Sequence, residues 1–304
     1  MTARIRVRSL AKINLDLRVL NKRPDGYHDL RTIFQTVSLA DTIDIEYSPG
    51  RTQINLNSNL NIPGNLIVKS ADSILATTHK TGRIGFVLRK RIPLGAGLGG
   101  GSSNAAAVLM ALPRLLGKPL PIEKLMELAA ALGSDVPFFL LGGTAVGLGR
   151  GTELYPLPDH PSLPALLITP GIHVSTPEAY RALQRGSTTD VIPHIQEFQS
   201  LAWRLTSAPS SDWDCVNDFE TVVFHQHPQL KSIKGKLQKL GARPALMSGS
   251  GSTVFGIFPN RDLRDRATGM FRREFAGDQV HSVQLVSRSR YSGLWRRKLE
   301  SVRG

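Results

Sequence analysis

The feature that most constrains this chain is a glycine-rich run, "PLGAGLGGGSS", at residues 93–103. Alternating apolar residues in "GRIGFVLRKRI" predict a strand before it, and the small apolar residues after it predict a helix through Leu116. A loop that leads from a strand into a helix presents free backbone N–H groups and the positive end of the helix dipole. The run therefore predicts an anion site, and phosphate is the usual guest.

Two familiar nucleotide motifs do not fit this run. A Walker A loop ends in Gly-Lys-Ser/Thr, whereas this run ends in Gly-Ser-Ser. A dinucleotide-binding fingerprint can be drawn through Gly95, Gly97 and Gly100, but no acidic residue follows at about twenty positions further on. A flexible connector is the remaining interpretation, and so many glycines between a clear strand and a clear helix argue against it.

The composition is that of a globular protein with excess positive charge. Hydrophobic residues make up 41% and charged residues 20% of the 304 residues. The N-terminus has no signal-peptide pattern and no apolar stretch could span a bilayer, so we expect a cytoplasmic protein. The single cysteine, Cys215, excludes a disulfide framework. The net charge of +14 suits an anionic ligand, but aromatic residues are only 6%, and we expect no nucleic-acid partner.

The order of predicted elements indicates two domains. In "RIRVRSLAKINLDLRVL" apolar and polar residues alternate, which predicts a long strand before the turn "KRPDGYH". Strands at "DTIDIEY" and "TQINLN", a helix over residues 65–76 and a helix at "PIEKLMELAAAL" complete the first part. A proline-rich linker at 156–164 precedes a second set of strands and helices, with the turn "SGSGS" between two strands. We expect domains at 1–158 and 159–287 and a basic tail at 288–304.

The glycine run resembles the phosphate-binding motif of the GHMP kinases, P-x-x-x-G-L-G-S/G-S-S-x-A. Four longer blocks are similar to the branch of this family that acts on a cytidine diphosphate-linked methylerythritol, and the similarity extends over residues 6–285. These blocks are "AKINLDLRVLNKRPDGYHDLRTIFQTVSL", "PLGAGLGGGSSNAAA", "LGSDVPFFLLGGTAVGLGRGTEL" and "MSGSGSTVFGIF". In the motif, the residues that carry the resemblance are Pro93, Gly97, Leu98, Gly99, Ser102 and Ser103.

The resemblance implies a fold and an activity. The fold is the two-domain GHMP kinase fold of α+β class, with an N-terminal α/β domain of the ribosomal S5 domain 2-like type and a C-terminal ferredoxin-like domain. The activity is ATP-dependent phosphorylation of the 2-hydroxyl of the alcohol, in the methylerythritol phosphate route to isoprenoids. Mg²⁺ is expected with ATP, but no carboxylate cluster in the sequence marks a metal site, so no metal ligand is assigned. We expect a monomer or a weak dimer.

Two residues are the candidate catalytic pair. Asp135 follows the helix stop at Gly133, and an aspartate that caps a short helix begun by Pro137, or that lies in the turn before it, would look the same in the sequence. Lys12 lies on the polar face of the first strand, where a solvent-exposed face is also a natural interpretation. The resemblance implies that Asp135 is the general base for the acceptor hydroxyl and that Lys12 stabilises the forming negative charge.

The resemblance also implies the binding residues. Tyr27 and Tyr180 would stack on the two faces of the pyrimidine, and His28 would bond its polar edge. Further contacts to the alcohol substrate would come from Asn14, Thr176, Gly249 and Ser250. The ATP site would consist of Asn65, Pro93, Leu94, Gly95, Ala96, Gly97, Leu98, Gly99, Gly100, Gly101, Ser102 and Ser103.

Two alternative functions remain open at this level. Another GHMP kinase would act on a different alcohol, such as a homoserine-type or mevalonate-type substrate, and the "PDGYH" block argues against it. A nucleotide- or RNA-binding protein could retain the fold without turnover. ATP consumption that depends on the cytidylyl substrate, and the salt dependence of RNA binding, would separate these functions.

Overall fold

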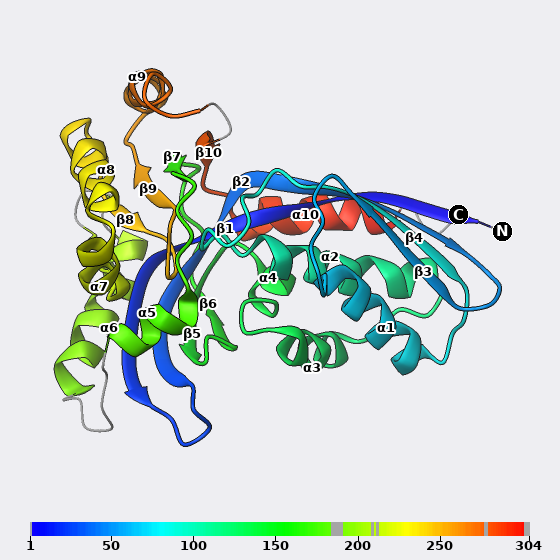
Figure 1. The fold of residues 1–304 in the computed structure, drawn as a ribbon. Coiled ribbons are helices and arrows are strands. Elements are labelled where there is room, and N and C mark those ends of the chain that lie inside the picture. The colour runs from blue at the N-terminus through cyan, green and yellow to red at the C-terminus, as the bar shows by residue number, and fades with distance from the viewer. Residues whose placement is uncertain (1, 184–190, 208–209, 211–212, 277–278, 301–304) are drawn as a thin grey trace.

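The computed structural model describes residues 2–183, 191–207, 210, 213–276 and 279–300. Two sheets, each covered by helices, organise these residues (Figure 1). The strands are β1 (Ala3–Lys22), β2 (His28–Ser48), β3 (Gln53–Ser58), β4 (Arg83–Arg89), β5 (Thr144–Gly149), β6 (Glu153–Pro156), β7 (Pro164–Ile168), β8 (Ala245–Met247), β9 (Val254–Ile257) and β10 (Val280–Gln284). The helices are α1 (Leu66–Thr78), α2 (Gly100–Leu115), α3 (Ile122–Leu132), α4 (Phe138–Leu141), α5 (Thr176–Ala182), α6 (Val191–Ser207), α7 (Phe219–Gln226), α8 (Pro228–Lys239), α9 (Arg261–Phe271) and α10 (Arg288–Glu300).

The first sheet has the strand order β3-β4-β2-β5-β6, and β1 pairs with β2. Only β3 and β4 pair in parallel, through the α1 crossover, and the other pairs are antiparallel. Helices α1 to α4 lie on one side of this sheet (Figure 1). The small residues of α2, among them Ala105 to Ala107, are buried in the same core as Ile43 and Phe86 of the sheet.

The second sheet has the order β10-β7-β9-β8, with every pair antiparallel. The chain passes from β7 through helices to the β8–β9 hairpin, and then through α9 to β10. This β-α-β-β-α-β path is the ferredoxin-like arrangement. The fold class expected from the sequence is therefore confirmed. The expected domain boundary, at 158/159, lies in the link between β6 and β7.

The β1–β2 hairpin joins the two halves of the molecule and crosses it almost from end to end (Figure 1). The alternation in the sequence predicted β1, but it did not predict that one strand contributes to three cores. A register shift between Leu10 and Ala11 turns the strand after its first part. The apolar residues then pack in succession in the first domain (Ile5, Val7), between the sheets (Ala11, Ile13, Leu15) and in the second domain (Leu17, Val19).

The segment expected to be a basic tail forms helix α10 and packs on the first domain. Tyr291 and Trp295 are buried in the core that also holds α2 and α4. The Tyr291 hydroxyl donates a 2.5 Å hydrogen bond to the backbone oxygen of Phe139. Within the described part of the chain, no helix is both long enough and apolar enough to cross a membrane.

Candidate active site

A cleft of about 400 Å³ lies where the glycine run, the middle of the β1–β2 hairpin and the "SGSGS" turn meet. Both domains contribute to it. Its lining includes both residues that the sequence analysis assigned to catalysis and five of the seven assigned to substrate binding. The lining residues that matter below are Lys12, Asn14, Thr32, Phe34, Gly95, Gly97, Gly99, Asp135, Arg150, His173, Thr176, Tyr180, Gly249 and Ser250.

Lys12 and Asp135 meet in this cleft. Lys12 Nζ lies 3.4 Å from Asp135 Oδ2 and donates a 2.6 Å hydrogen bond to Asn14 Oδ1. The lysine side chain is only 4% exposed, whereas that of Asp135 is 33% exposed. A buried ammonium needs this kind of pairing, because burial without a partner disfavours its charge. The solvent-exposed interpretation of Lys12 is therefore wrong.

Asn14 connects Lys12 to the surrounding strands. Its Nδ2 donates to Thr32 Oγ1 at 2.8 Å, and the Thr32 hydroxyl donates to the backbone oxygen of Asp16 at 2.7 Å. The amide therefore turns its oxygen towards the ammonium and its nitrogen towards β2. This chain of bonds holds Lys12 in one position without using the carboxylate of Asp135, which stays available to the cleft.

The local sequence explains the position of Asp135. Helix α3 ends at the Gly133 cap, and the short helix α4 begins after Pro137, which occupies the cap position without a side-chain bond. Asp135 lies in the turn between these two helices and does not cap α4. The helix-capping interpretation of Asp135 is therefore wrong, and its side chain is directed to Lys12 instead.

Helix α2 begins earlier in the glycine run than a serine cap would require. Gly99 is its N-cap residue, with φ of 66°, and Ser102 and Ser103 lie in its first turn. The backbone N–H of Ser103 already bonds to the Gly99 oxygen. The Ser103 hydroxyl is buried and has no hydrogen-bond partner among the described residues. A ligand that bonded this hydroxyl would remove the cost of leaving it unsatisfied.

The glycines of the run are required mostly by neighbouring protein atoms. A Cβ on Gly97 would lie 1.9 Å from the Ser248 carbonyl oxygen, and one on Gly99 would lie 2.9 Å from the Phe139 ring. A Cβ on Gly100 would lie 2.8 Å from the side chain of Ile92. Gly101 differs, because the nearest atom to its Cβ position belongs to another helix at 3.9 Å. Only the last of these positions offers open space for a ligand.

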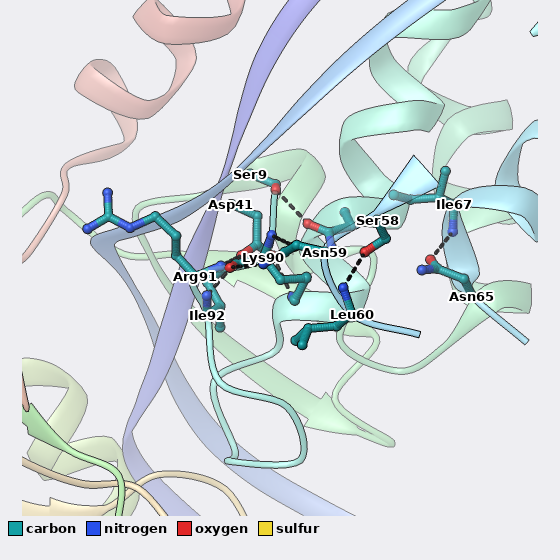
Figure 2. Close-up of polar contacts among 11 residues, drawn as sticks. Ser9, Asp41, Ser58, Asn59, Leu60, Asn65, Ile67, Lys90, Arg91 and Ile92 are labelled. Atoms are coloured by element: carbon teal, nitrogen blue, oxygen red, sulfur yellow. Dashed lines mark hydrogen bonds and ion pairs between the residues drawn. The ribbon is translucent and has the colours of Figure 1, made fainter. Parts of the chain in front are cut away.

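A buried ion pair supports the entry to the run (Figure 2). Lys90 Nζ and Asp41 Oδ2 are 2.5 Å apart, and both side chains are almost fully buried. The second carboxylate oxygen of Asp41 accepts bonds from the backbone N–H groups of Arg91 and Ile92. Three donors from the chain just before Pro93 therefore bind the one carboxylate of Asp41, which fixes this segment.

The "SGSGS" turn of the second domain contacts the glycine run directly. The Ser248 hydroxyl donates to the Gly97 oxygen at 2.9 Å and accepts a bond from the Asn14 backbone N–H at 3.3 Å. Ser250 Oγ and Thr176 Oγ1 are 2.7 Å apart. The predicted substrate residues Thr176, Gly249 and Ser250 thus line the cleft together.

The predicted pyrimidine residues are arranged differently from a simple two-sided clamp. The rings of His28 and Tyr180 stack on each other at 5.0 Å between centroids. A base between two rings needs about 7 Å, which is twice a normal contact distance. Tyr27 is covered instead by the guanidinium of Arg150, 3.5 Å from the ring centroid. Of these four residues, only Tyr180 and Arg150 line the cleft.

Burial changes the proton affinity of both rings that stack. It raises the pKa of Tyr180, with a smaller contribution from the negative charge of Asp135. It lowers the pKa of His28 below the usual 6.5, and the positive charge of Lys22 acts in the same direction. At neutral pH the two side chains therefore meet a ligand as a neutral phenol and a neutral imidazole.

Asn65 caps helix α1, because its Oδ1 accepts the backbone N–H of Ile67 at 3.0 Å (Figure 2). This places the start of α1 beside the glycine run, since Leu66 is the nearest neighbour of the Gly101 Cβ position. The capping bond uses the amide oxygen and leaves the amide nitrogen for a ligand.

Two titratable cleft residues, among others, were not found from the sequence. Arg150 follows β5 and brings a positive charge into the cleft, and His173 lies within 3.7 Å of the Gly95 Cβ position. The only signal for Arg150 was its position as a lone basic residue inside the glycine-rich block "GLGRG". Nothing in the local sequence distinguished His173. Among the residues that the structure describes, no group of three or more His, Cys, Asp or Glu could hold a metal ion.

Comparisons with known proteins agree with this geometry. The GHMP kinases N terminal domain matches residues 65–143, and the GHMP kinases C terminal domain matches residues 181–277. A 4-diphosphocytidyl-2-C-methyl-D-erythritol kinase of Solibacter usitatus is 52% identical over 98% of this chain and 94% of its own. The corresponding enzyme of a Geobacter species is 43% identical over 83% of this chain and 89% of its own.

Solved structures lead to the same family. A crystal structure of 4-(cytidine 5'-diphospho)-2C-methyl-D-erythritol kinase has a TM-score of 0.76 and 36% identity, and it covers 92% of this chain and 99% of its own. The homoserine kinase of Cytophaga hutchinsonii has a TM-score of 0.72 at 19% identity, over 94% and 95% of the chains, and shows the shared fold alone. The chain belongs to the GHMP kinases and, within them, to the family of the 4-diphosphocytidyl-2-C-methyl-D-erythritol kinases.

Proposed function

We propose that this protein transfers the γ-phosphoryl group of ATP to the 2-hydroxyl of 4-diphosphocytidyl-2-C-methyl-D-erythritol. The observation that carries the proposal is the meeting of Lys12 Nζ and Asp135 Oδ2, 3.4 Å apart, in a cleft bordered by the glycine run. The identity of the substrate rests on the relatives, which are kinases of this alcohol.

Asp135 is the group that prepares the acceptor. Its carboxylate accepts the hydroxyl proton as the oxygen forms a bond to the γ-phosphorus and the bond between that phosphorus and ADP breaks. Lys12 has three N–H protons, of which one bonds to Asn14 and one faces Asp135. The third is available to an oxygen of the transferring group, where charge increases in the transition state.

The first turn of α2 receives the phosphates of ATP. Its free backbone N–H groups, the open space at Gly101 and the unsatisfied Ser103 hydroxyl all suit phosphate oxygens. Mg²⁺ binds to nucleotide phosphates with only one or two protein carboxylates, so the lack of a carboxylate cluster among the described residues is compatible with it. Asp135 is the one carboxylate among the described cleft residues and acts as the base, so no protein ligand is assigned to the ion, which would screen the phosphate charge. The Asn65 amide nitrogen would face the adenine.

The pyrimidine would occupy the end of the cleft near Tyr180. Because Arg150 covers Tyr27, we propose that the base replaces the guanidinium on the Tyr27 ring and that Arg150 moves to the substrate diphosphate. His28 would then bond the polar edge of cytosine as a neutral ring. This arrangement requires His28 and Tyr180 to separate from their stacked position.

The test is ADP release with ATP and a panel of alcohols: the cytidylyl substrate, its uridylyl analogue, homoserine and mevalonate. We expect turnover with the cytidylyl substrate, and Asp135→Asn should reduce kcat by at least about 100-fold while the melting temperature stays near wild type. Asp265→Asn, on the exposed surface of α9, is the matched control and should have no effect. Preferential turnover of another alcohol would overturn the proposed identity of the substrate. No turnover at all would indicate a nucleotide-binding protein without activity.

Both domains of the chain contribute residues to the cleft, including the proposed catalytic pair. A monomer or a weak dimer is therefore compatible with the activity. We propose a cytoplasmic location, because ATP is supplied there.

A further inference from the structure

Three arginines from both domains line a hollow of about 250 Å³, which we call the arginine pocket. Arg8 belongs to β1, Arg91 follows β4, and Arg272 follows α9. The pocket shares no lining residue with the catalytic cleft. Its other lining residues are Ser38, Leu39, Ala40, Val280, His281, Ser282 and Val283.

The charge of Arg8 is uncompensated, unlike that of its neighbour on the same strand face. Arg6 lies opposite Asp44 in the β1–β2 register and forms an ion pair with it. Two residues further along, Arg8 lies opposite Thr42, which carries no charge. The row of cross-strand ion pairs therefore stops where the pocket begins.

No residue of the described chain forms a hydrogen bond or an ion pair with the guanidinium groups of Arg8, Arg91 or Arg272. Arg91 uses only its backbone N–H, which binds Asp41. Its side chain extends away from the Asp41–Lys90 ion pair (Figure 2). Like charges gathered in one hollow repel one another unless an anion lies among them.

We propose that the arginine pocket binds a small anion that carries a diphosphate group. Three guanidinium groups match the roughly three negative charges of such a group at neutral pH, and each can bond two oxygens at once. The volume suits a compact ligand and is below the usual range of about 300–1,000 Å³ for larger molecules. The ion pairs of Arg4 and Arg6 neutralise the adjoining surface, which argues against an extended polyanion such as RNA.

The position of Arg91 connects this pocket to the glycine run. Arg91 is two residues before Pro93, and its backbone is already bonded to Asp41. An anion that joined Arg91 to Arg272 would therefore tie the start of the glycine run to the second domain. We expect anion binding in the arginine pocket to change the affinity of the glycine run for ATP.

The experiment is calorimetric titration of the full chain with inorganic pyrophosphate, in the wild type and in variants that change the arginine pocket but leave the catalytic cleft intact. We expect the wild type to bind pyrophosphate at a site that depends on Arg8 and Arg272. Arg8→Ser and Arg272→Ser should each weaken it by about tenfold, which is the usual size of one charge-assisted hydrogen bond. Arg4→Ser is the matched control, because Arg4 lies on the same strand face but is paired with Glu46, and it should leave the affinity unchanged.

Melting curves of the variants check that each one folds. Equal pyrophosphate affinity in the wild type, Arg8→Ser and Arg272→Ser would overturn the proposal, and so would an equal loss in Arg4→Ser. Single-stranded RNA that binds more tightly than pyrophosphate and loses affinity in the same two variants would assign the pocket to nucleic acid instead. The comparison uses binding alone, so its failure is distinct from a failure of the proposed kinase activity.

Discussion

Two glycines of the same run should respond in opposite ways to the same substitution to alanine. A methyl group on Gly97 would lie 1.9 Å from the Ser248 carbonyl oxygen, and the residue has φ of 76°. The methyl group on Gly101 would meet no atom closer than 3.9 Å, and this residue is helical. Gly97→Ala therefore tests the contact between the domains, and Gly101→Ala tests the approach of phosphate.

The structure gives the expected magnitude for Gly97→Ala. The left-handed backbone costs an alanine about 1–2 kcal/mol, and forcing the carbonyl away costs about 1–3 kcal/mol. A loss of about 2–5 kcal/mol lowers the melting temperature of a chain of this size by roughly 3–8 °C. Differential scanning calorimetry measures the melting temperature. A value equal to wild type would mean that the Ser248 carbonyl can shift at little cost in free energy.

Gly101→Ala should leave the protein as stable as wild type or slightly more stable, because alanine favours a helix by about 0.5–1 kcal/mol. ATP affinity should nevertheless fall by at least about tenfold if the Gly101 backbone bonds a phosphate, since such a bond contributes about 1.5 kcal/mol or more. Gly235→Ala, in open space on α8, is the control for the effect of alanine in a helix. Unchanged ATP affinity in Gly101→Ala would refute the phosphate role of this position.

Three further changes test other parts of the site. Arg150→Ala should raise KM for the cytidylyl substrate and leave KM for ATP unchanged, and a change in the ATP value alone would contradict the placement of the pyrimidine beside Tyr27. Tyr291→Phe should lower the free energy of unfolding by about 1–3 kcal/mol, measured in urea, because the Phe139 carbonyl loses its buried partner. Because burial holds the pKa of His28 below 6.5, KM for the cytidylyl substrate should be flat above pH 7 and rise only in acid, where the protonated ring no longer accepts a bond. His28→Gln should remove that rise, and a rise that persists in the variant would assign the titration to another group.

Much of the local structure could be predicted from the sequence. The alternation before the turn "KRPDGYH" predicted β1, and the helix expected at residues 65–76 is α1 at Leu66–Thr78. The helix expected to end at Leu116 is α2, which ends at Leu115. These elements were predictable because their period and their caps are properties of neighbouring residues.

Local pattern could not decide the roles of Lys12 and Asp135. Each had an ordinary interpretation, as an exposed strand residue or as a helix cap, and the family resemblance was needed to favour catalysis. The two residues are far apart in the chain, and their 3.4 Å contact exists only because the fold brings the turn between α3 and α4 beside β1. A contact of this kind leaves no periodic signal in either segment.

The C-terminal segment and two cleft residues also could not be predicted from local sequence. The segment from Arg288 onward was expected only as a basic tail, but Tyr291 and Trp295 anchor helix α10 in the core of the first domain. His173 carried no local signal, and Arg150 carried only its position in the glycine-rich block "GLGRG". The net charge of a segment does not indicate which of its apolar residues will be buried against another part of the fold.

The sequence by itself determined most of the secondary structure, the family and the presence of a phosphate-binding loop, because these depend on residue spacing over short distances. Only the tertiary structure decided why each glycine is needed. Gly97, Gly99 and Gly100 make room for Ser248, Phe139 and Ile92, which come from three different places in the chain. The physical reason is steric, because the space around a Cα depends on the atoms that the tertiary structure packs beside it. A sequence motif shows that a glycine is present but not which neighbouring atoms require it.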